Sequence, residues 1–319
     1  MNRYMTIGGL IERENLGHCQ PHEHLYIDET PAAAVNPYLR MDDLEKSTRE
    51  LIQYRLSGGH SVVDAQPVGA GRNDGQLMEI AQRSQISIIA STGFHVPMFY
   101  AGDHWIHTAS EEKLTELFGS ELSCGMFADG RTGWPVQRSC RCAGIVKAAI
   151  SSAGMTVRTC TLLRAAGRAA HAHGAPVMLH TEKGFCASAA VDLLTGLGLA
   201  PDRIIVCHAD RQTQDLTPHR ELAQKGVYLE YDTIGRFKYH SDVAEISLIG
   251  EMIRAGFGKQ ILLSLDTTAN RFLSYGGEIG LHYLLVHFIP ELQKAGISEE
   301  ICRQLTQDNP SQALRQKPL

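Results

Sequence analysis

Two histidines stand two residues apart in the motif PHEHLYID, as His22 and His24. Side chains alternate along a β-strand, so both imidazoles would point to one side and could hold a metal ion between them. The chain has 15 histidines. A second pair, His171 and His173, falls in an expected helix, where residues i and i+2 diverge by about 200°. A metal site at His22 and His24 therefore depends on further ligands downstream.

Further ligand types stand at the ends of later strand-like segments. Lys147, His180, His208 and Asp266 each follow or end a short apolar run. With the strand that carries His24, these are the first, fourth, fifth, sixth and eighth predicted strands. Four imidazoles, one carboxylate and one lysine form a set suited to two divalent metal ions. We expect Zn²⁺, with Mn²⁺ or Co²⁺ as alternatives.

Lysine is the unusual member of this set, because an ammonium group repels metal ions. A neutral lysine amine can react with CO₂ to give a carbamate, N6-carboxylysine, which is an anion with two oxygen ligands. Such a group could bridge two metal ions about 3.5–4 Å apart. The sequence therefore predicts that Lys147 is carboxylated.

The remaining ligands divide between the two expected ions. His22, His24 and Asp266 would hold the more buried ion, and His180 and His208 the more exposed one. Two such ions polarise a carbonyl or phosphoryl oxygen and make hydroxide available near neutral pH. Asp266 could also carry a proton from the attacking water to the leaving oxygen.

The elements that would position these residues alternate between strands and helices. The expected strands are mostly continuous apolar runs, typical of parallel strands buried on both faces; they span 18–24, 61–65, 86–91, 144–150, 176–181, 203–208, 227–232 and 260–266. Helical patterns occupy 43–56, 157–174, 242–256 and 277–296. Eight such units predict one α/β domain over 1–319, a (β/α)₈ TIM barrel with its active site at the C-terminal rim.

The longest interruption lies between the third and fourth strands, at 92–143. It contains a helical segment at 110–122 and a loop with Gly, Trp and Pro, so we expect an excursion over the barrel mouth. The sequence predicts no conformation for that loop. Cys140 and Cys142 could form half of a zinc site, but the chain lacks a matching second half.

Composition excludes several classes of partner. Apolar residues make up 43% of the chain, charged residues 20%, and the formal net charge is −5. This charge argues against nucleic acid or an anionic membrane surface as the main partner. The N-terminus has no signal-peptide h-region, and no segment approaches 18 unbroken apolar residues. We therefore expect a cytoplasmic protein whose eight scattered cysteines are reduced.

Several motifs together resemble a known family. From about residue 15 to the segment 308–314, the chain is similar to the phosphotriesterase-like branch of the amidohydrolase superfamily; the motifs include PHEHLYID, STGFH, AGIVKAAIS, CHADR, DTIGRFK and ILLSLDTT. The resemblance implies a binuclear metal hydrolase, in many members a homodimer. It also implies the same metal ligands: His22, His24, carboxylated Lys147, His180, His208 and Asp266.

Cationic and hydroxyl side chains after the last two strands indicate an anionic substrate. Lys238 follows the seventh strand, and Arg271 and Tyr275 follow the eighth. Phosphate groups are commonly held by these loops in TIM barrels, and an arginine fork, an ammonium and a phenol suit a phosphate monoester. The arrangement resembles the phosphorylated-sugar lactonases of the family. His95 and Tyr100, after the third strand, are further candidates for contact with a small-molecule substrate.

The sequence thus predicts a hydrolase that opens a lactone ring, best a phosphorylated aldono-1,4-lactone. Metal-bound hydroxide would attack the carbonyl, and Asp266 would shuttle the proton. A carboxylesterase or organophosphate triesterase with the same metals is the nearest alternative. A Schiff-base aldolase using Lys147 is an alternative of another class. A barrel that has lost turnover is a third, against which the intact ligand set argues.

Overall fold

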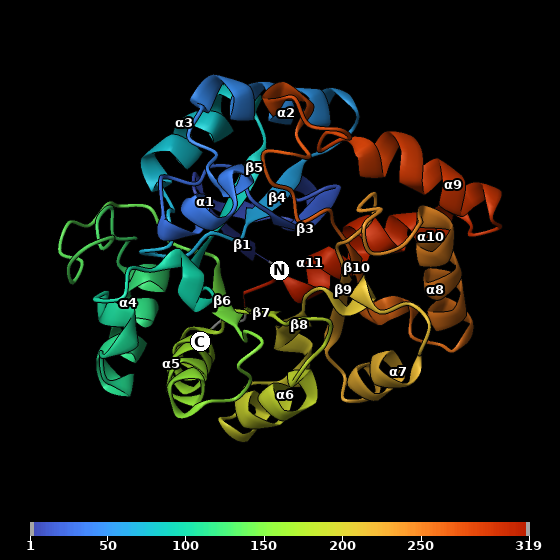
Figure 1. Ribbon diagram of the computed structural model, residues 1–319. Helices are drawn as coiled ribbons and strands as arrows, with labels where there is room; N and C mark the ends of the chain where they lie inside the picture. Colours follow the sequence, from blue (N-terminus) through green and yellow to red (C-terminus); the bar gives the residue numbers. More distant parts are fainter. Residues whose placement is uncertain (1–2, 317–319) are drawn as a thin grey trace.

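Eight parallel strands form the centre of the molecule, in a computed structural model that describes residues 3–316. Each strand pairs with the next along the chain, and helices surround them (Figure 1). The strands are β3 (Cys19–Glu23), β4 (Ser61–Asp64), β5 (Ser87–Gly93), β6 (Ile145–Ala149), β7 (Val177–His180), β8 (Ile204–Val206), β9 (Tyr228–Tyr231) and β10 (Ile261–Leu263). All eight predicted strands are present, so the predicted (β/α)₈ barrel is confirmed.

Helices follow the strands on the outside of the barrel. They are α1 (Pro31–Val35), α2 (Leu44–Leu56), α3 (Asp74–Ser84), α4 (Glu111–Ser123), α5 (Val157–His173), α6 (Ala187–Gly196), α7 (Thr217–Gln224), α8 (Asp242–Arg254), α9 (Ile289–Lys294), α10 (Glu299–Arg303) and α11 (Asn309–Ala313). Their ends match the local sequence. The Asp43 carboxylate caps α2 by accepting from the Lys46 amide, and Gly174 ends α5 in the left-handed region. Within residues 3–316, no helix is both long and apolar enough to span a membrane.

The predicted helix over 277–296 is wrong in its first half. A regular helix begins only with a π-helical turn at Leu284–Phe288 and continues as α9. A Cβ atom on Gly277 would lie 2.6 Å from the backbone carbon of Asn270, and Gly280 has a φ of +74°. This stretch is therefore a loop folded tightly against the preceding chain, and its helical periodicity is misleading.

An N-terminal hairpin was not predicted. It consists of β1 (Arg3–Thr6) and β2 (Gly9–Glu12), which pair in antiparallel fashion. Tyr4 is fully buried and packs with residues from inside the barrel, such as Val63, Met178 and Leu262. Its hydroxyl donates to the backbone oxygen of Ser311, 2.8 Å away. In Figure 1, β1 lies near the centre of the ring of helices. The hairpin thus supplies packing at the inner core of the barrel.

Side chains join the first barrel strand to the last. The buried Glu23 carboxylate accepts from the Ser264 hydroxyl and the Leu265 amide, both at 2.9 Å, and from the Thr267 amide at 3.0 Å. The Asp266 amide donates to the backbone oxygen of His22 at 3.1 Å. These bonds bring residues from opposite ends of the chain to one part of the rim.

The excursion between β5 and β6 is anchored by a buried ion pair. Arg72 and Glu121 of α4 approach to 2.6 Å, and both side chains are at most 1% exposed. Glu121 also accepts from the Phe127 amide at 2.8 Å, which fixes the start of the following loop. The loop then doubles back through an antiparallel bridge between Phe127 and Arg138. The predicted helical segment is confirmed as α4.

Candidate metal centre

Three buried side chains converge where the first barrel strand, β3, meets the last, β10; we call this place the joined edge of the barrel. One ligand atom each from His22, His24 and Asp266 lies within 4.8 Å of the other two. Oδ1 of Asp266 lies 3.7 Å from Nε2 of His22 and 3.5 Å from Nε2 of His24. His22 belongs to β3, whereas His24 and Asp266 follow the ends of β3 and β10. The structure thus brings together the three residues expected to hold the more buried ion.

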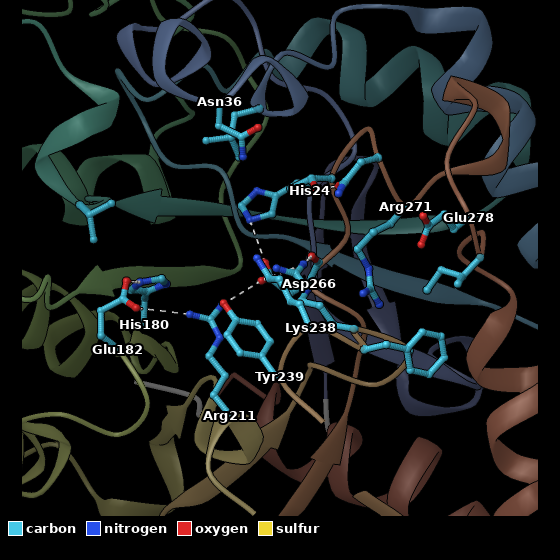
Figure 2. A pocket seen from close by; sticks show the side chains of 18 of the residues that line it. His24, Asn36, His180, Glu182, Arg211, Lys238, Tyr239, Asp266, Arg271 and Glu278 are labelled. Carbon is cyan, nitrogen blue, oxygen red and sulfur yellow. Dashed lines mark hydrogen bonds and ion pairs between the residues drawn. The ribbon is translucent and has the colours of Figure 1, made fainter. Parts of the chain in front are cut away.

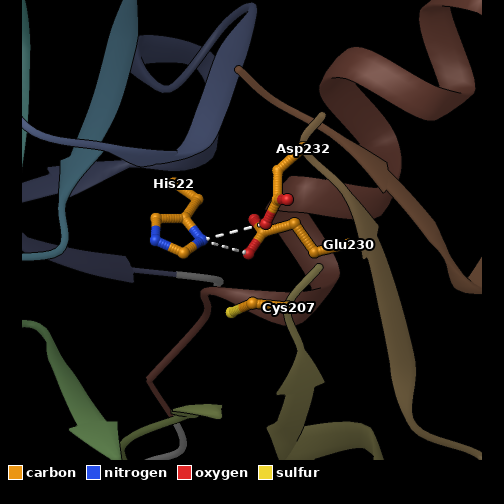
Figure 3. Close-up of side chains that lie close together, drawn as sticks. All are labelled: His22, Cys207, Glu230 and Asp232. Atoms are coloured by element: carbon orange, nitrogen blue, oxygen red, sulfur yellow. Dashed lines mark hydrogen bonds and ion pairs between the residues drawn. The ribbon is translucent and has the colours of Figure 1, made fainter. Parts of the chain in front are cut away.

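Two acidic residues lie behind these ligands. Nδ1 of His22 contacts Glu230 at 3.0 Å and Asp232 at 3.1 Å, as Figure 3 shows. Asp232 also contacts Nδ1 of His208 at 2.7 Å. Carboxylates on Nδ1 fix the orientation of the ring and leave Nε2 free for a metal ion. Cys207 lies beside the same cluster, with a pKa that burial raises well above its usual range.

Lys147 lies in the middle of β6 instead of at its end, and its side chain is completely buried. Its Nζ atom is 3.0 Å from Nε2 of His22 and 3.4 Å from Sδ of Met178. Among residues 3–316, no carboxylate forms an ion pair with this amine. A buried ammonium group without an anionic partner is costly. The position therefore fits a neutral or carboxylated lysine.

His180 and His208 form a second pair beside the first. Nε2 of His208 lies 2.8 Å from Nδ1 of His180, and the rings are 4.5 Å apart. His22 and His208 are also neighbours, with ring centroids at 5.0 Å. His208 and Asp266 both adopt positive φ, at 60° and 48°. Strained backbone of this kind is concentrated at functional sites.

Burial controls the charge of these groups. Burial, with a smaller effect from the nearby Lys147, lowers the pKa of His22 to about 4. Burial also lowers the pKa of His180, and it lowers the pKa of His208 well below its usual value. Burial acts to raise the pKa of Asp266, but Arg236 and the imidazoles outweigh it and hold that pKa well below its usual range. Neutral imidazoles and an ionised carboxylate are the forms that bind metals.

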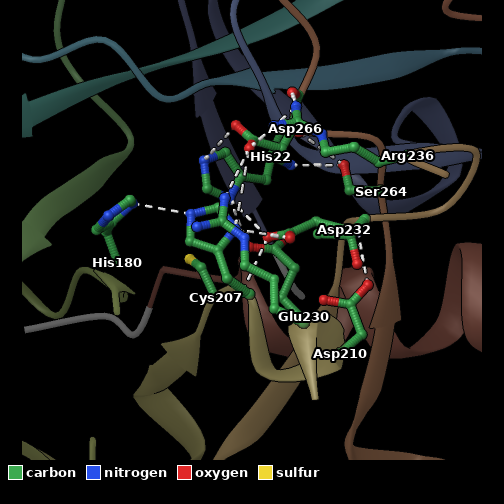
Figure 4. Close-up of polar contacts among 12 residues, drawn as sticks. His22, His180, Cys207, Asp210, Glu230, Asp232, Arg236, Ser264 and Asp266 are labelled. Atoms are coloured by element: carbon green, nitrogen blue, oxygen red, sulfur yellow. Dashed lines mark hydrogen bonds and ion pairs between the residues drawn. The ribbon is translucent and has the colours of Figure 1, made fainter. Parts of the chain in front are cut away.

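The arrangement of these residues therefore suits two divalent ions. Three ligand atoms already converge, two further imidazoles lie next to them, and acidic groups orient His22 and His208 from behind. The donors are nitrogen and oxygen atoms, which suit Zn²⁺ and similar ions. Figure 4 shows His22, His180 and Asp266 close to the acidic residues Glu230 and Asp232.

The cluster opens into a cavity of about 570 Å³. His24, His180 and Asp266 line it, and Figure 2 shows Asp266 between His180 on one side and Arg271 on the other. Four cationic side chains line the same cavity: Arg211, Arg236, Lys238 and Arg271. The cavity thus combines candidate metal ligands with a concentration of positive charge.

The arginines are held by their neighbours but retain unused donors. Arg211 and Arg236 approach Oδ2 of Asp266 to 3.3 and 3.2 Å. Arg271 donates to the backbone oxygen of Ile234 at 2.6 Å, and burial lowers its pKa to about 10. Within the described chain, the buried Nε atoms of all three arginines have no hydrogen-bond partner. An anion in the cavity could satisfy donors of this kind.

The predicted substrate residues are only partly brought together. Lys238, Arg271 and His95 line the cavity, whereas Tyr100 and Tyr275 are absent from its lining. The Tyr100 hydroxyl accepts from the backbone amide of His95 at 2.8 Å, so it supports the loop that carries this imidazole.

Tyr275 is directed toward the start of α2. Its hydroxyl donates to the backbone oxygen of Asp43 at 2.9 Å and lies 3.0 Å from the hydroxyl of Ser47. In this conformation the structure does not bring Tyr275 together with Lys238 and Arg271.

Arg211 and Arg236 were missed by the sequence predictions, as were Asp232 and Glu230. Each follows a strand or lies within one, and Arg211 and Arg236 belong to the motifs CHADR and DTIGRFK. The criterion that selected Lys238, a cation after a barrel strand, also applies to both arginines.

Known proteins are similar to this chain in sequence and in fold. The model of the phosphotriesterase family matches residues 2–314. A phospho-furanose lactonase from Mycoplasmopsis agalactiae is 29% identical over 318 residues, which cover 97% of this chain and 90% of that protein. An amidohydrolase structure from Mycoplasma synoviae has a TM-score of 0.94 at 28% identity, covering 99% of this chain and 92% of that one. A lactonase structure from Listeria monocytogenes has a TM-score of 0.91 at 26% identity, with coverage of 99% and 100%.

Proposed function

Because the chain belongs to the phosphotriesterase family, we propose that it is a metal-dependent hydrolase that opens the ring of a phosphorylated sugar lactone. One observation carries this function: the ligand cluster and four cationic side chains line a single cavity. The cluster suits activation of water near a carbonyl, and the cations suit a substrate with a phosphate group. The similarity to phospho-furanose lactonases supports the same substrate class.

The metal centre would use the six predicted ligands: His22, His24, Lys147, His180, His208 and Asp266. Zn²⁺ suits these ligands best, with Mn²⁺ or Co²⁺ as alternatives. Lys147 would carry a carboxylate on Nζ, which replaces a buried cation with an anion. When bound, the two ions would polarise the lactone carbonyl and lower the pKa of water toward neutrality.

The protein's own side chains would position the substrate and move the proton. Arg236, Lys238 and Arg271 would bind the phosphate and so orient the lactone carbonyl toward the ligand cluster. Asp266 is held ionised by its arginine neighbours, so it can accept a proton from the attacking water. It would then deliver this proton to the ring oxygen as the carbon–oxygen bond breaks, which yields the hydroxy acid.

The alternatives explain fewer of these features. An aldolase would need Lys147 to form a Schiff base, but this residue is fully buried and absent from the cavity lining. A neutral aryl ester or a phosphotriester would leave the four cationic side chains of the cavity without a matching anion. A panel of phosphorylated lactones, unphosphorylated lactones, aryl esters and phosphotriesters would compare these activities. Faster hydrolysis of the esters or triesters than of every lactone would contradict the proposed function.

Lys238→Ala tests recognition of the phosphate. Lys238 is exposed at the cavity and forms no ion pair within residues 3–316. A charge-assisted contact of about 1.5–3 kcal/mol corresponds to a roughly 10–100-fold change in rate. We expect kcat/KM to fall by that factor for the phosphorylated lactone and by less than about threefold for its unphosphorylated analogue. Lys259→Ala, at an exposed lysine outside the cavity, is the control. Equal losses for both substrates would contradict phosphate binding by Lys238.

A further inference from the structure

A second group of ligand types lies outside the metal centre. One ligand atom each from Asp210, His240 and Glu245 lies within 4.8 Å of the other two. Asp210 belongs to a 3₁₀ turn at Ala209–Arg211 after β8, His240 follows β9, and Glu245 lies in the first turn of α8. In Figure 4, Asp210 lies below Asp232, on the side away from Asp266. Three segments distant in sequence thus contribute to this group.

The carboxylates of this group are buried and incompletely bonded. Asp210 and Glu245 are both 0% exposed. Oδ2 of Asp210 accepts from the Thr233 amide at 2.6 Å, but its Oδ1 has no hydrogen-bond partner within residues 3–316. Neither carboxylate oxygen of Glu245 has one in that part of the chain. Buried carboxylate oxygens without donors are costly to keep ionised, and a bound cation would offset that cost.

His240 is oriented as a ligand toward these oxygens. Its Nδ1 lies 3.3 Å from the backbone oxygen of Ser241, so it can donate there. Its Nε2 then carries the lone pair and faces Oε2 of Glu245 at 3.1 Å and Oγ1 of Thr233 at 3.0 Å. The contact with Glu245 has an ion-pair distance but not hydrogen-bond geometry. An imidazole nitrogen and carboxylate oxygens that face one another are donor atoms that could share one metal ion.

The nearby arginines do not supply the missing charge. Arg211 and Arg236 both direct their guanidinium groups to Asp266, on the side of the metal centre. A second cavity of about 510 Å³ is lined by His240, and Arg211 and Tyr239 line both this cavity and the substrate cavity. A small cation could therefore reach His240 through this second cavity.

We propose that Asp210, His240 and Glu245 bind a third divalent transition-metal ion, Zn²⁺ or Mn²⁺. Two carboxylates and one imidazole suit these ions. Two ligand atoms bonded to one ion at about 2.1 Å are at most about 4.2 Å apart, so the group needs only a small contraction to close around it. The ion is separate from the metal centre, because Asp232 and Thr233 lie between them. It would fix the loops that carry Arg211 and Tyr239, which line the substrate cavity.

Metal content tests this site independently of the catalytic metals. Wild-type protein, His240→Ala and a control, His171→Ala, are loaded with Zn²⁺, dialysed, and measured by elemental mass spectrometry. His171 is an exposed histidine on α5. We expect His240→Ala to contain about one ion per chain less than the wild type, and the control to match the wild type. If the proposed metal centre is wrong, all totals fall but this difference remains.

Diffraction gives a second measurement that does not depend on a variant that folds. Crystals of the wild-type protein grown with Zn²⁺ should show an anomalous peak at the zinc edge between Asp210, His240 and Glu245. Glu245→Gln should remove this peak and leave any peak at His22 and His24. No peak between the three residues, or equal zinc in the wild type and His240→Ala, would overturn the proposal.

Discussion

At the scale of single residues, the site depends on side chains that would touch no metal ion. Asp232 contacts Nδ1 of His22 and Nδ1 of His208 and also accepts from the His208 amide at 3.1 Å. One carboxylate therefore orients an imidazole of each expected ion. It lies at the end of a predicted strand, as the ligands do, so its position alone could have identified it.

Asp232→Asn should weaken metal binding while the ligands themselves remain. An amide cannot accept from both imidazoles as a carboxylate does, so His22 and His208 lose their orientation. Loss of such a supporting group typically lowers metal affinity about 10–100-fold. Competition between the protein and a chromogenic chelator measures this change. Asp103→Asn, at an exposed position of the mouth loop, should leave the affinity unchanged. An unchanged affinity in Asp232→Asn would mean that Glu230 alone orients His22.

The candidate metal ligands could be predicted from the sequence, but the set of cationic side chains that line the cavity could be predicted only in part. His22, His24 and Asp266 come together because strand ends of a barrel meet at one rim, which depends only on topology. The directions of the Tyr275 and Arg236 side chains depend on which groups their polar atoms contact. The Tyr275 hydroxyl contacts Asp43 and Ser47, which are far away in the sequence, so no local sequence pattern predicts that contact.

At the scale of elements, the strands were predictable because each is a short apolar run buried on both faces. The segment 277–296 shows the limit of this approach. Its apolar spacing is helical, but Gly277 packs against the backbone of Asn270 and Arg271. A close approach between distant chain segments decides the local structure there. The N-terminal hairpin likewise depends on packing inside the barrel.

Glu121 should be decisive for the attachment of α4 to the barrel. Glu121→Gln removes the negative charge opposite the buried Arg72 and leaves that guanidinium without an ionic partner. Breaking a buried ion pair from one side costs about 3–5 kcal/mol in the free energy of unfolding. Urea-induced unfolding measures it. Glu116→Gln, at an exposed position on the same helix, should change it by less than about 0.5 kcal/mol. A similarly small effect of Glu121→Gln would show that the pair does not hold α4 in place.

At the scale of the whole molecule, the proposed metal centre lies where the barrel closes. His22 and His24 belong to the first barrel strand and its end, and Asp266 follows the last. An ion bound between them would add a link to the hydrogen bonds of Glu23. Metal binding should therefore stabilise the complete fold as well as support activity.

Removal of the metals should lower both activity and thermal stability. A ligand present at a hundred times its Kd stabilises the folded state by about 2.7 kcal/mol. After treatment with a chelator we expect the Tm to fall by roughly 5 °C and hydrolysis to cease. Calorimetry and an activity assay measure these changes, and added Zn²⁺ should reverse both. A metal-free protein with an unchanged Tm would contradict the link between the ions and closure.

Stability of the metal-free protein should fall in mild acid. Burial, followed by the nearby His60, lowers the pKa of His18 from 6.5 to about 3. The unfolded chain therefore binds a proton that the folded chain excludes, so stability is complete above pH 6.5 and falls as the pH drops toward 3. One such group contributes up to about 1.4 kcal/mol per pH unit. His18→Phe should make this decline shallower, as measured by urea unfolding at several pH values.

A second variant checks that this pH effect comes from the buried imidazole. His171→Phe, at an exposed position, should leave the slope as it is in the wild type. An unaltered slope in His18→Phe would assign the acid sensitivity to the other buried histidines, such as His22.

The joined edge also has a consequence for how the protein is made. His22 and Ser264, which hydrogen-bond across it, are 242 positions apart in the chain. A nascent polypeptide can form its first strands and helices while it is still being synthesised. It lacks Asp266 until most of the chain has left the ribosome. Stable binding of an ion at the proposed centre would therefore have to wait until Asp266 has been synthesised.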